Sequence, residues 1–275
     1  MKDGFKDKVA IVTGGASGIG RALCEEMARR GTRIVVADIN LQGAEQVASA
    51  ISAAGGQADA ARLDVTQSDE VQKLIDQTAS KHGRLDFMFN NAGIATLGEV
   101  RDMKPEQWQR IIDINLMGVV YGTTAAYSLM VDQGFGHIVN TASQAGLYPV
   151  SSTTSYALTK HGVVGLSTSL RAEGAGLGVK VSVVCPGPVV SNIVDDATMV
   201  GEYKKNVFAE VPQYMLMDTS KAARVILRDV ARNRAIIVFP FLARYLWWLH
   251  RISPSISGFV ARVMTEGQRR YRTGP

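Results

Sequence analysis

The sequence predicts an α/β protein with a doubly wound parallel β-sheet of about seven strands and helices on both of its faces. Short runs rich in β-branched residues alternate with longer segments of helical periodicity along most of the chain. Such alternation produces right-handed βαβ units and therefore parallel strands. The 275 residues fit one α/β domain, and no repeat, low-complexity stretch or linker divides them.

The elements follow in order from the N-terminus. Strands are predicted at 9–12, 33–37, 58–63, 85–89, 137–140, 180–184 and 235–239. Helices are predicted at 21–30, 42–54, 68–82, 105–130, 155–173 and 220–232. We expect residues 1–240 to form the dinucleotide-binding and catalytic domain and residues 241–275 to form an extension.

The segment 189–219 breaks this rhythm. It follows a strand, has weak periodicity and contains Asp195, Asp196, Gly201 and Pro212. A long irregular insertion at the carboxyl end of a strand is typical of a lid over a ligand site. The alternative is a surface loop with a short helix.

Composition restricts the possible function classes. Hydrophobic residues make up 46% of the chain, which is ordinary for a globular protein. The two cysteines, Cys24 and Cys185, provide neither a disulfide framework nor a metal cluster, so we expect no metal and a cytoplasmic location. The polar segment 1–8 leads directly into an apolar strand, which predicts no signal peptide.

A glycine-rich turn follows the first predicted strand. It reads Thr13-Gly14-Gly15-Ala16-Ser17-Gly18-Ile19-Gly20 and leads into a helix. Glycines permit a tight turn and let a phosphate approach the backbone N–H groups at the helix N-terminus. The spacing is not Gly-x-Gly-x-x-Gly, and no Gly-Lys-Ser/Thr ending of a nucleoside-triphosphate loop is present. A simple strand–helix turn would need similar residues, but the position at the first βα junction favours a dinucleotide.

Asp38 indicates which dinucleotide to expect. It ends the second strand, eighteen positions after Gly20. A carboxylate there accepts the adenosine ribose hydroxyls of NAD and repels the 2′-phosphate of NADP. No Lys or Arg precedes Gly18 in the loop or directly follows Asp38. We therefore expect NAD, with capping of the helix near Asn40 as the alternative role of this carboxylate.

Further motifs end the later strands. Asn90-Asn91-Ala92-Gly93 ends the fourth strand, Ser143 follows the fifth, and Pro186-Gly187 ends the sixth. Tyr156 and Lys160 lie four positions apart on a predicted helix and therefore share one face. With the glycine loop, this set resembles the short-chain dehydrogenase/reductase family over about residues 8–239. The resemblance implies a Rossmann-like fold, an NAD(H)-dependent oxidoreductase and a homodimer or homotetramer.

The resemblance also implies roles for individual residues. The implied cofactor-binding residues are Gly14, Ser17, Gly18, Ile19 and Gly20 at the pyrophosphate; Asp64 and Val65 at the adenine; Asn91, Ala92 and Gly93 at the adenosine ribose; Lys160, with Tyr156 nearby, at the nicotinamide ribose; and Pro186, Gly187, Val189 and Ser191 at the nicotinamide. The implied catalytic residues are Asn115, Ser143, Tyr156 and Lys160. Family members often have Thr where Ser191 stands.

The residue types suit the oxidation of an alcohol. The reaction needs a base for the hydroxyl proton while a hydride leaves for the nicotinamide. A free tyrosine has a pKa of about 10, and lowering it to about 7 needs roughly 4 kcal/mol of preference for the phenolate. The ammonium of Lys160, one helical turn away, is expected to supply this field. Ser143 would hold the substrate oxygen, and Asn115 a water relay behind Lys160.

Alternatives from other classes stay open. A non-catalytic dinucleotide sensor usually lacks the Tyr–Lys pair, which is intact here. A sugar epimerase or dehydratase usually carries a larger C-terminal domain, and an enoyl reductase spaces Tyr and Lys more widely. A 3-oxoacyl-thioester reductase remains the nearest alternative. His137 and His161 have no evident acid partner, and neither cysteine is an expected nucleophile.

Apolar residues near the expected site indicate a lipophilic alcohol or ketone, such as a steroid-like, retinoid-like or long-chain compound. They are Ala145, Gly146, Leu147, Tyr148, Pro149 and Val150, together with Val194, Met199, Val200, Phe208, Val211, Tyr214, Met215, Leu216 and Met217 of the predicted lid. Ordinary packing of the lid against the body is the alternative.

The C-terminal extension differs in charge from the rest of the chain. The net charge of +5 lies within residues 241–275, which carry six arginines and one acidic residue, while the remainder is neutral. We expect no nucleic-acid partner. A helix from Phe241 to Pro254 would carry Leu242, Tyr245, Leu246 and Leu249 in one stripe, but arginines interrupt each apolar run before the roughly 18 residues of a membrane span. The extension therefore predicts either peripheral contact with a membrane or packing on the body, the substrate pocket or a partner subunit.

Overall fold

The computed structural model describes residues 4–190, 193, 197–202 and 216–273. The strands of the main sheet are β1 (Val9–Thr13), β2 (Arg33–Asp38), β3 (Gln57–Arg62), β4 (Phe87–Asn90), β6 (Gly136–Thr141), β7 (Val179–Pro186) and β9 (Ile236–Phe239). The α-helices are α1 (Gly18–Arg29), α2 (Leu41–Ala53), α3 (Ser68–His82), α4 (Pro105–Ile112), α5 (Gly118–Gln133), α6 (Thr154–Glu173), α7 (Thr219–Ala231), α8 (Phe241–Ile252) and α9 (Pro254–Arg269).

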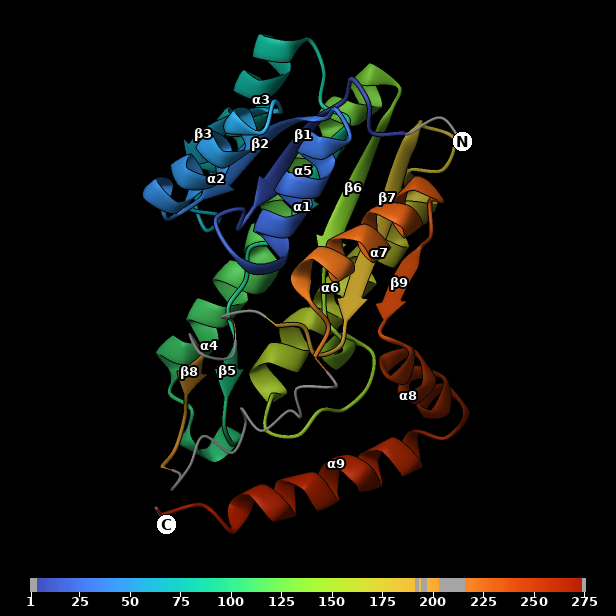
Figure 1. Ribbon diagram of the computed structural model, residues 1–275. Helices are drawn as coiled ribbons and strands as arrows, with labels where there is room; N and C mark the ends of the chain where they lie inside the picture. The colour runs from blue at the N-terminus through green and yellow to red at the C-terminus, as the bar shows by residue number, and fades with distance from the viewer. Residues whose placement is uncertain (1–3, 191–192, 194–196, 203–215, 274–275) are drawn as a thin grey trace.

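The seven strands form one parallel sheet in the order β3-β2-β1-β4-β6-β7-β9 (Figure 1). This confirms the predicted doubly wound, Rossmann-like fold. The chain first adds strands outward from β1 to β3 and then returns to β4 on the other side of β1. Ligands of such sheets bind beside this reversal, at the carboxyl ends of the strands.

Two apolar layers hold the helices on the sheet. On one face, α1, α2 and α7 bury side chains such as Leu23, Val47 and Ile226 against the strands. On the other face, α3 and α5 bury Ile75 and Met130. The central strands are buried on both sides, which explains their continuous Val- and Ile-rich runs.

The long helix predicted at 105–130 contains a break. A π-helical turn, Asp113–Met117, separates α4 from α5. A π-turn adds one residue to the helical repeat and often lies at a functional site, and Asn115 is within this one. The segment Pro105–Gln133 is long and apolar enough to cross a membrane, but α5 packs on α3 and β6 as a core helix does.

Additional structure gathers beyond the carboxyl ends of the strands. Two short strands, β5 (Thr96–Leu97) and β8 (Thr198–Met199), pair in parallel and tie part of the predicted lid to the body. The helices α8 and α9 lie at this same end, and α9 crosses beneath it (Figure 1). The strand pair was not predicted, because two residues are too few to show a period.

Candidate functional site

The glycine loop lies between β1 and α1, at the carboxyl edge of the sheet. Gly14 and Gly18 have φ values of +65° and +53°, which glycine adopts most easily. A Cβ on Gly20 would lie 2.0 Å from the Gly14 carbonyl oxygen. Ser17, the N-cap of α1, makes no side-chain capping hydrogen bond, so the N–H groups of the first turn could hold a phosphate.

The turn after β4 is fastened to this loop. The Thr13 hydroxyl accepts hydrogen bonds from the N–H groups of Asn91 and Ala92, each at 3.0 Å. The Asn91 side chain donates to the Thr13 carbonyl at 3.1 Å. Thr13 was not predicted as a site residue, although a hydroxyl residue just before the glycine loop was a visible signal. It positions the two turns relative to each other.

Asp38 connects the end of β2 to the same loop. Its carboxylate accepts hydrogen bonds from the N–H groups of Ala16, at 3.0 Å, and Asn40, at 2.9 Å. The N-cap of α2 is Asn40, whose side chain accepts from the Gly43 N–H. Asp38 therefore does not cap the helix, and its half-buried carboxylate could accept hydroxyl groups at the cofactor edge.

Asp64 and Val65 follow β3, near the same edge. The Asp64 carboxylate accepts from the N–H and hydroxyl groups of Thr66. Val65 packs so closely on α5 that a Cβ on Gly118 would lie 2.8 Å from its side chain. The turn that could contact an adenine is thus held by a local hydrogen-bonded turn and by a close helix approach.

Asn115 is fully buried and binds the turn after β4 through its side chain. Its side chain accepts from the Ile94 N–H and donates to the Ile94 carbonyl, both at 2.8 Å. A Cβ on Gly93 would lie 3.1 Å from the Asn115 side-chain oxygen and 3.5 Å from the Lys160 amine. Asn115 therefore adjoins Lys160, but its side chain is bonded to backbone, so the expected relay would have to use other atoms of this π-turn.

Ser143, Tyr156 and Lys160 converge where β6 ends and α6 begins. Ser143 follows β6 and caps a short 3₁₀ turn, Gln144–Gly146, through its hydroxyl. Tyr156 lies in the first turn of α6, and Lys160 lies one turn later with its amine 5.4 Å from the centre of the Tyr156 ring. The Lys160 amine donates to the Thr141 carbonyl of β6 at 3.0 Å. This bond fixes the position of the Lys160 amine beside the end of β6.

The pKa values of Tyr156 and Lys160 are both shifted in the folded chain. Burial raises the pKa of Tyr156 to about 12, although the Ser143 hydroxyl, by hydrogen bonding, opposes the shift. Burial also lowers the pKa of Lys160 to about 8. Loss of solvent around both groups is the main cause of these two shifts. That Lys160 lowers the pKa of Tyr156 during the reaction stays a prediction.

Lys160 gives a prediction about stability. Its pKa in the folded chain lies below the ordinary value of 10.5, so the unfolded chain binds the proton more tightly. Below pH 8 the lysine is charged in both states, and burying the ammonium lowers the free energy of unfolding by at most about 3 kcal/mol. This penalty shrinks as pH rises from 8 to 10.5, so the folded chain becomes more stable over that range. At pH 7 we expect the free energy of unfolding of Lys160→Met to exceed that of wild type by about 1–2 kcal/mol. Removing the buried charge stabilises the folded chain, and loss of the hydrogen bond to Thr141 offsets part of that stabilisation.

Urea unfolding at several pH values measures this difference, which should fall as pH rises from 8 and reverse in sign near pH 10.5, where only the lost bond to Thr141 remains. Lys73→Met, on the exposed face of α3, removes a lysine charge without relieving burial. A Lys160→Met variant that is less stable than wild type by the same amount at every pH would contradict the expectation.

The remaining expected cofactor residues lie at the end of β7. Pro186 ends that strand, and Gly187 follows it with its N–H bonded to the Phe239 carbonyl. Val189 and Met217 form an isolated parallel β-bridge, so the two ends of the predicted lid lie side by side. Ser191 lies outside the described residues, as do Val194, Phe208, Val211, Tyr214 and Met215 of the lid.

Comparisons with known proteins agree with this geometry. Residues 8–199 match the short chain dehydrogenase family. The chain belongs to the short-chain dehydrogenase/reductase family. It is 37% identical over 206 residues to a cyclohexanol dehydrogenase of Acinetobacter sp. (strain SE19), covering 73% of this chain and 81% of the relative. It is 33% identical over 255 residues to the putative oxidoreductase SadH of Mycobacterium tuberculosis, covering 91% and 92%.

A solved structure matches this short-chain dehydrogenase/reductase over its whole length. It is a short-chain dehydrogenase/reductase of Burkholderia phymatum in complex with NAD, with a TM-score of 0.84 and 27% identity, covering 100% of this chain and 99% of the other. The family and fold expectations are thereby confirmed, and the chain is a nicotinamide-dinucleotide oxidoreductase at this level of description.

Sequence reasoning missed a buried polar network behind the site of this short-chain dehydrogenase/reductase. The Asn90 side chain donates to Asn140 at 2.8 Å and to Thr123 at 3.2 Å, and Asn140 donates to Ser167 at 3.0 Å. These contacts join β4, β6, α5 and α6 beneath the catalytic candidates. The signal was present in Asn90 and Asn140, which are paired near the carboxyl ends of adjacent strands.

The histidines and cysteines have structural surroundings. His137 is buried, bonds to Ser182, and has its pKa lowered to about 3 by burial. His161 bonds to the Ala157 carbonyl on the exposed side of α6. Both cysteines are free and buried, and burial raises the pKa of each thiol, that of Cys185 to about 12. Neither would be a thiolate nucleophile at neutral pH.

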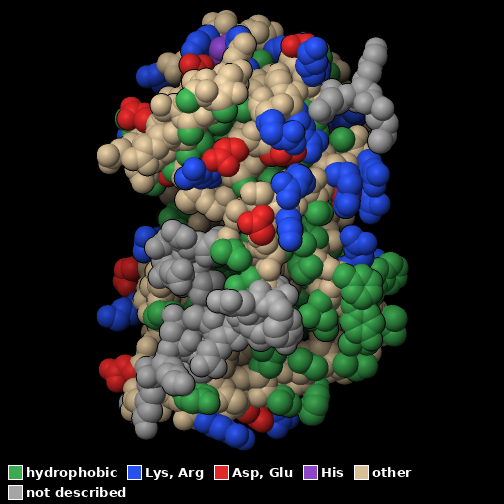
Figure 2. Space-filling model, viewed as in Figure 1, with side chains coloured by type: hydrophobic (Ala, Val, Ile, Leu, Met, Phe, Trp, Pro, Cys, Tyr) green, Lys and Arg blue, Asp and Glu red, His purple; other side chains and the backbone are tan. Residues whose placement is uncertain are grey.

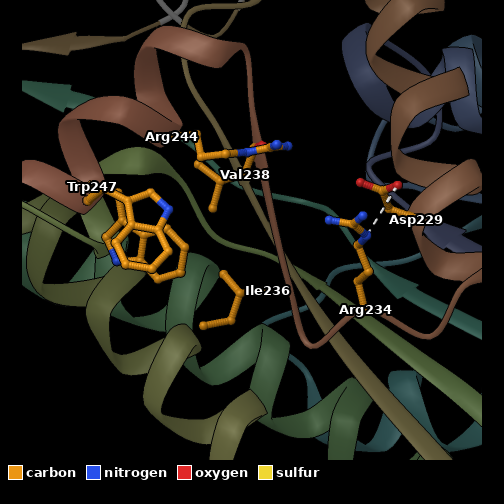
Figure 3. Close-up of a pocket in the computed structure, with 7 residues that line it drawn as sticks. Asp229, Arg234, Ile236, Val238, Arg244 and Trp247 are labelled. Atoms are coloured by element: carbon orange, nitrogen blue, oxygen red, sulfur yellow. Dashed lines mark hydrogen bonds and ion pairs between the residues drawn. The ribbon is translucent and has the colours of Figure 1, made fainter. Parts of the chain in front are cut away.

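A surface cavity of about 280 Å³ lies between α7, β9 and α8, away from Tyr156 and Ser143. Figure 3 shows Arg244 and Trp247 projecting from α8 on one side and the ion pair of Arg234 with Asp229 on the other. None of the expected catalytic residues lines this cavity, so it is not the active site.

Proposed function

We propose that this chain is an NAD(H)-dependent oxidoreductase that interconverts a lipophilic secondary alcohol and its ketone. The observation that carries the proposal is the convergence of Ser143, Tyr156 and Lys160 at the carboxyl edge of the sheet, which also carries the glycine-rich loop between β1 and α1. Each group alone is common. Together they provide a proton donor, a hydrogen bond for the substrate oxygen and a cation within one pocket edge.

The residues present fit a dinucleotide. Gly14 and Gly20 let the loop pack closely against itself and the turn after β4, and this packing supports a pyrophosphate site at the N–H groups of α1. The Asp38 carboxylate beside the loop would accept ribose hydroxyls. The roles of Ile19, Asp64, Val65, Asn91, Ala92, Gly93, Pro186, Gly187, Val189 and Ser191 in cofactor binding belong to this proposal. A bound nicotinamide supplies the hydride acceptor or donor.

The chain itself handles the proton. With its pKa raised, the Tyr156 phenol is neutral at pH 7 and can donate its proton to a carbonyl oxygen during reduction. Oxidation of the alcohol needs the phenolate instead: Tyr156 first releases its phenolic proton to solvent and then accepts the hydroxyl proton of the alcohol. Ser143 orients the same substrate oxygen, and Lys160, held by Thr141, binds ribose and favours the phenolate. Asn115 acts as a positioning residue for the turn that borders Lys160.

The proposed substrate class follows from the apolar surroundings. Val150 and Val189 are half-buried and Met199 is partly exposed near this end of the sheet. Leu147 and Tyr148, which we expect near the substrate, are buried in a core cluster with Ala243 of α8, and Ala145 is buried as well. Similarity to a cyclohexanol dehydrogenase supports an apolar secondary alcohol. We further propose a homodimer or homotetramer, as the family resemblance implies. A cytoplasmic location is proposed because the free, buried cysteines suit a reducing compartment.

A screen of secondary alcohols, from short polar ones to sterols, tests the function through the absorbance of NADH. We expect turnover to rise as the alcohol becomes larger and more apolar. Binding of NAD without turnover of any alcohol, or of any ketone in the reverse assay, would instead support a non-catalytic sensor.

Asp38 gives a prediction about cofactor choice. We expect wild type to use NAD at least ten times better than NADP in kcat/KM, since the carboxylate repels a 2′-phosphate. Asp38→Asn, which keeps one acceptor for the Ala16 or Asn40 N–H, and Asp38→Ala should narrow this ratio. Glu45→Ala removes a charge from the exposed face of α2 and should leave the ratio unchanged. Equal use of both cofactors by wild type would overturn the NAD assignment.

A further inference from the structure

Helix α9 contacts the body through its polar side. Thr265 and Gln268 hydrogen-bond to the Ser151 hydroxyl at 2.8 and 2.6 Å, and Gln268 also accepts from Ser152. Arg269 forms an ion pair with Glu99 at 2.8 Å. Beyond the helix, Arg272 is bonded to Asp102 at 2.7 Å. Ala261, Thr265, Gln268 and Arg272 recur every three or four residues and therefore form one inward face, and Arg269 lies at its edge.

The opposite side of α9 is apolar and exposed. Ile256, Phe259, Val260, Val263 and Met264 follow one helical spacing and are each 45–66% exposed, and Tyr271, just beyond the helix, is 43% exposed. A surface helix of a globular protein normally turns this kind of stripe toward the core. The orientation of α9 is the reverse, and it is held by the ion pairs and hydrogen bonds of the inward face.

Helix α8 adds a second exposed stripe. Its inner residues Ala243, Leu246 and Trp247 pack in a core cluster, which fixes the helix to the body. Its outer residues Phe241, Tyr245, Trp248 and Ile252 are 54–79% exposed and lie on one face. Hydrophobic side chains gather over α8, with Lys and Arg side chains beside them (Figure 2).

The positive charge around these two apolar stripes indicates an anionic partner. Residues 241–275 carry six arginines and one acidic residue. Arg269 and Arg272 pair with body carboxylates, and Arg262 pairs with Glu266. For Arg244, Arg251 and Arg270, the described part of the chain holds no carboxylate within ion-pair distance. The Arg251 guanidinium lies 5.6 and 5.4 Å from the ring centres of Trp247 and Trp248.

We propose that the outer faces of α8 and α9 dock on an anionic lipid bilayer. Exposed aromatic and aliphatic side chains would enter the headgroup region, and the arginines without a carboxylate partner would meet lipid phosphates. Tryptophan and arginine suit this depth because each combines an apolar body with a polar end. A second copy of the chain fits less well, because a twofold interface would bring the same unneutralised arginines together.

The docking face has a fixed relation to the proposed active site. The loop that carries Ser151 and Ser152 lies directly before Tyr156, and the inward face of α9 is bonded to that loop. Docking would therefore hold the bilayer at the substrate end of the molecule. This orientation would let a lipophilic alcohol enter from the lipid phase, a consequence that rests on the proposed function, whereas docking itself does not.

Co-sedimentation with vesicles tests the proposal. Vesicles of equal parts phosphatidylcholine and phosphatidylglycerol are compared with phosphatidylcholine alone, at low and high salt. We expect the full chain to pellet with the anionic vesicles at low salt and at least tenfold less with the neutral ones, with release as salt rises. Phe259→Glu and Trp248→Glu, on the outer faces of α9 and α8, should each reduce binding at least tenfold. Leu177→Glu places the same charge at an exposed leucine elsewhere and should bind like wild type.

Thermal unfolding shows whether each variant is folded, and sedimentation velocity gives its oligomeric state. Failure of the intact chain to bind anionic vesicles at low salt would overturn the proposal. So would Phe259→Glu or Trp248→Glu variants that dissociate an oligomer while binding vesicles normally, because the face would then be a subunit interface. Vesicle binding by a chain that oxidises no alcohol would leave docking intact and reject only the proposed function.

Discussion

Tyr156→Phe should reduce kcat by at least a thousandfold while NAD still binds. The substitution removes only the phenolic O–H, which is the proposed donor and acceptor of the proton, and keeps the ring against which Lys160 lies. A thousandfold loss corresponds to about 4 kcal/mol of transition-state stabilisation. The measurement is steady-state turnover of the best alcohol, with NAD affinity from calorimetry or fluorescence.

Two results decide the assignment of Tyr156. Tyr121→Phe, which removes a hydroxyl from a half-buried tyrosine of α5, should keep kcat within a factor of two or so of wild type. If Tyr156→Phe kept more than about a tenth of wild-type kcat, the lost barrier would be under about 1.4 kcal/mol, too small for the removal of the proton-transfer group.

Gly20→Ala should weaken NAD binding by at least a hundredfold. The new Cβ would lie 2.0 Å from the Gly14 carbonyl oxygen and 2.7 Å from the Asn91 side-chain nitrogen. Both neighbours belong to the proposed phosphate and ribose site, and the first is backbone, so the glycine loop must move. A hundredfold loss equals about 2.7 kcal/mol of binding free energy, which calorimetric titration with NAD resolves.

Gly165→Ala is the matched control for this substitution. Gly165 lies within α6, where an added Cβ would meet nothing within 4 Å. Alanine there should raise stability by up to about 1 kcal/mol, since it favours helix more than glycine does. NAD affinity should stay at the wild-type value. A Gly20→Ala variant that binds NAD like wild type would place the cofactor away from the glycine loop.

The orientation of α9 shows where helical periodicity is insufficient. The sequence correctly predicted a helix from Phe241 that stops before Pro254, because the apolar spacing and the proline are local signals. The stripe predicted for α8 divides in space, since Leu246 packs inward and Tyr245 is exposed. For α9, the pattern would place the apolar face inward. The structure turns this face outward instead, because Arg269 and Arg272 form ion pairs with Glu99 and Asp102, more than 160 residues away in sequence.

The catalytic candidates show the same division between local and distant information. The sequence placed Tyr156 and Lys160 on one helical face, and placed Gly14, Gly18 and Gly20 at a strand–helix junction. Both statements depend only on spacing along the chain, so they required no fold. The parallel strand order then followed from βα alternation, because connections in such sheets have one handedness.

Only the tertiary structure decided how these groups are tuned. It bonded the Lys160 amine to the Thr141 carbonyl and the Asn115 amide to Ile94, contacts between segments 19 and 21 residues apart. It also buried Tyr156 enough to raise its pKa, whereas the sequence had suggested that Lys160 would lower it. Desolvation of a side chain depends on all the atoms packed around it. The attraction between the Lys160 ammonium and a Tyr156 phenolate depends on where the hydrogen bond to Thr141 holds the amine. The sequence by itself determined which chemical groups are present and on which element each lies, while packing determined their solvation, their partners and the direction in which the C-terminal helices face.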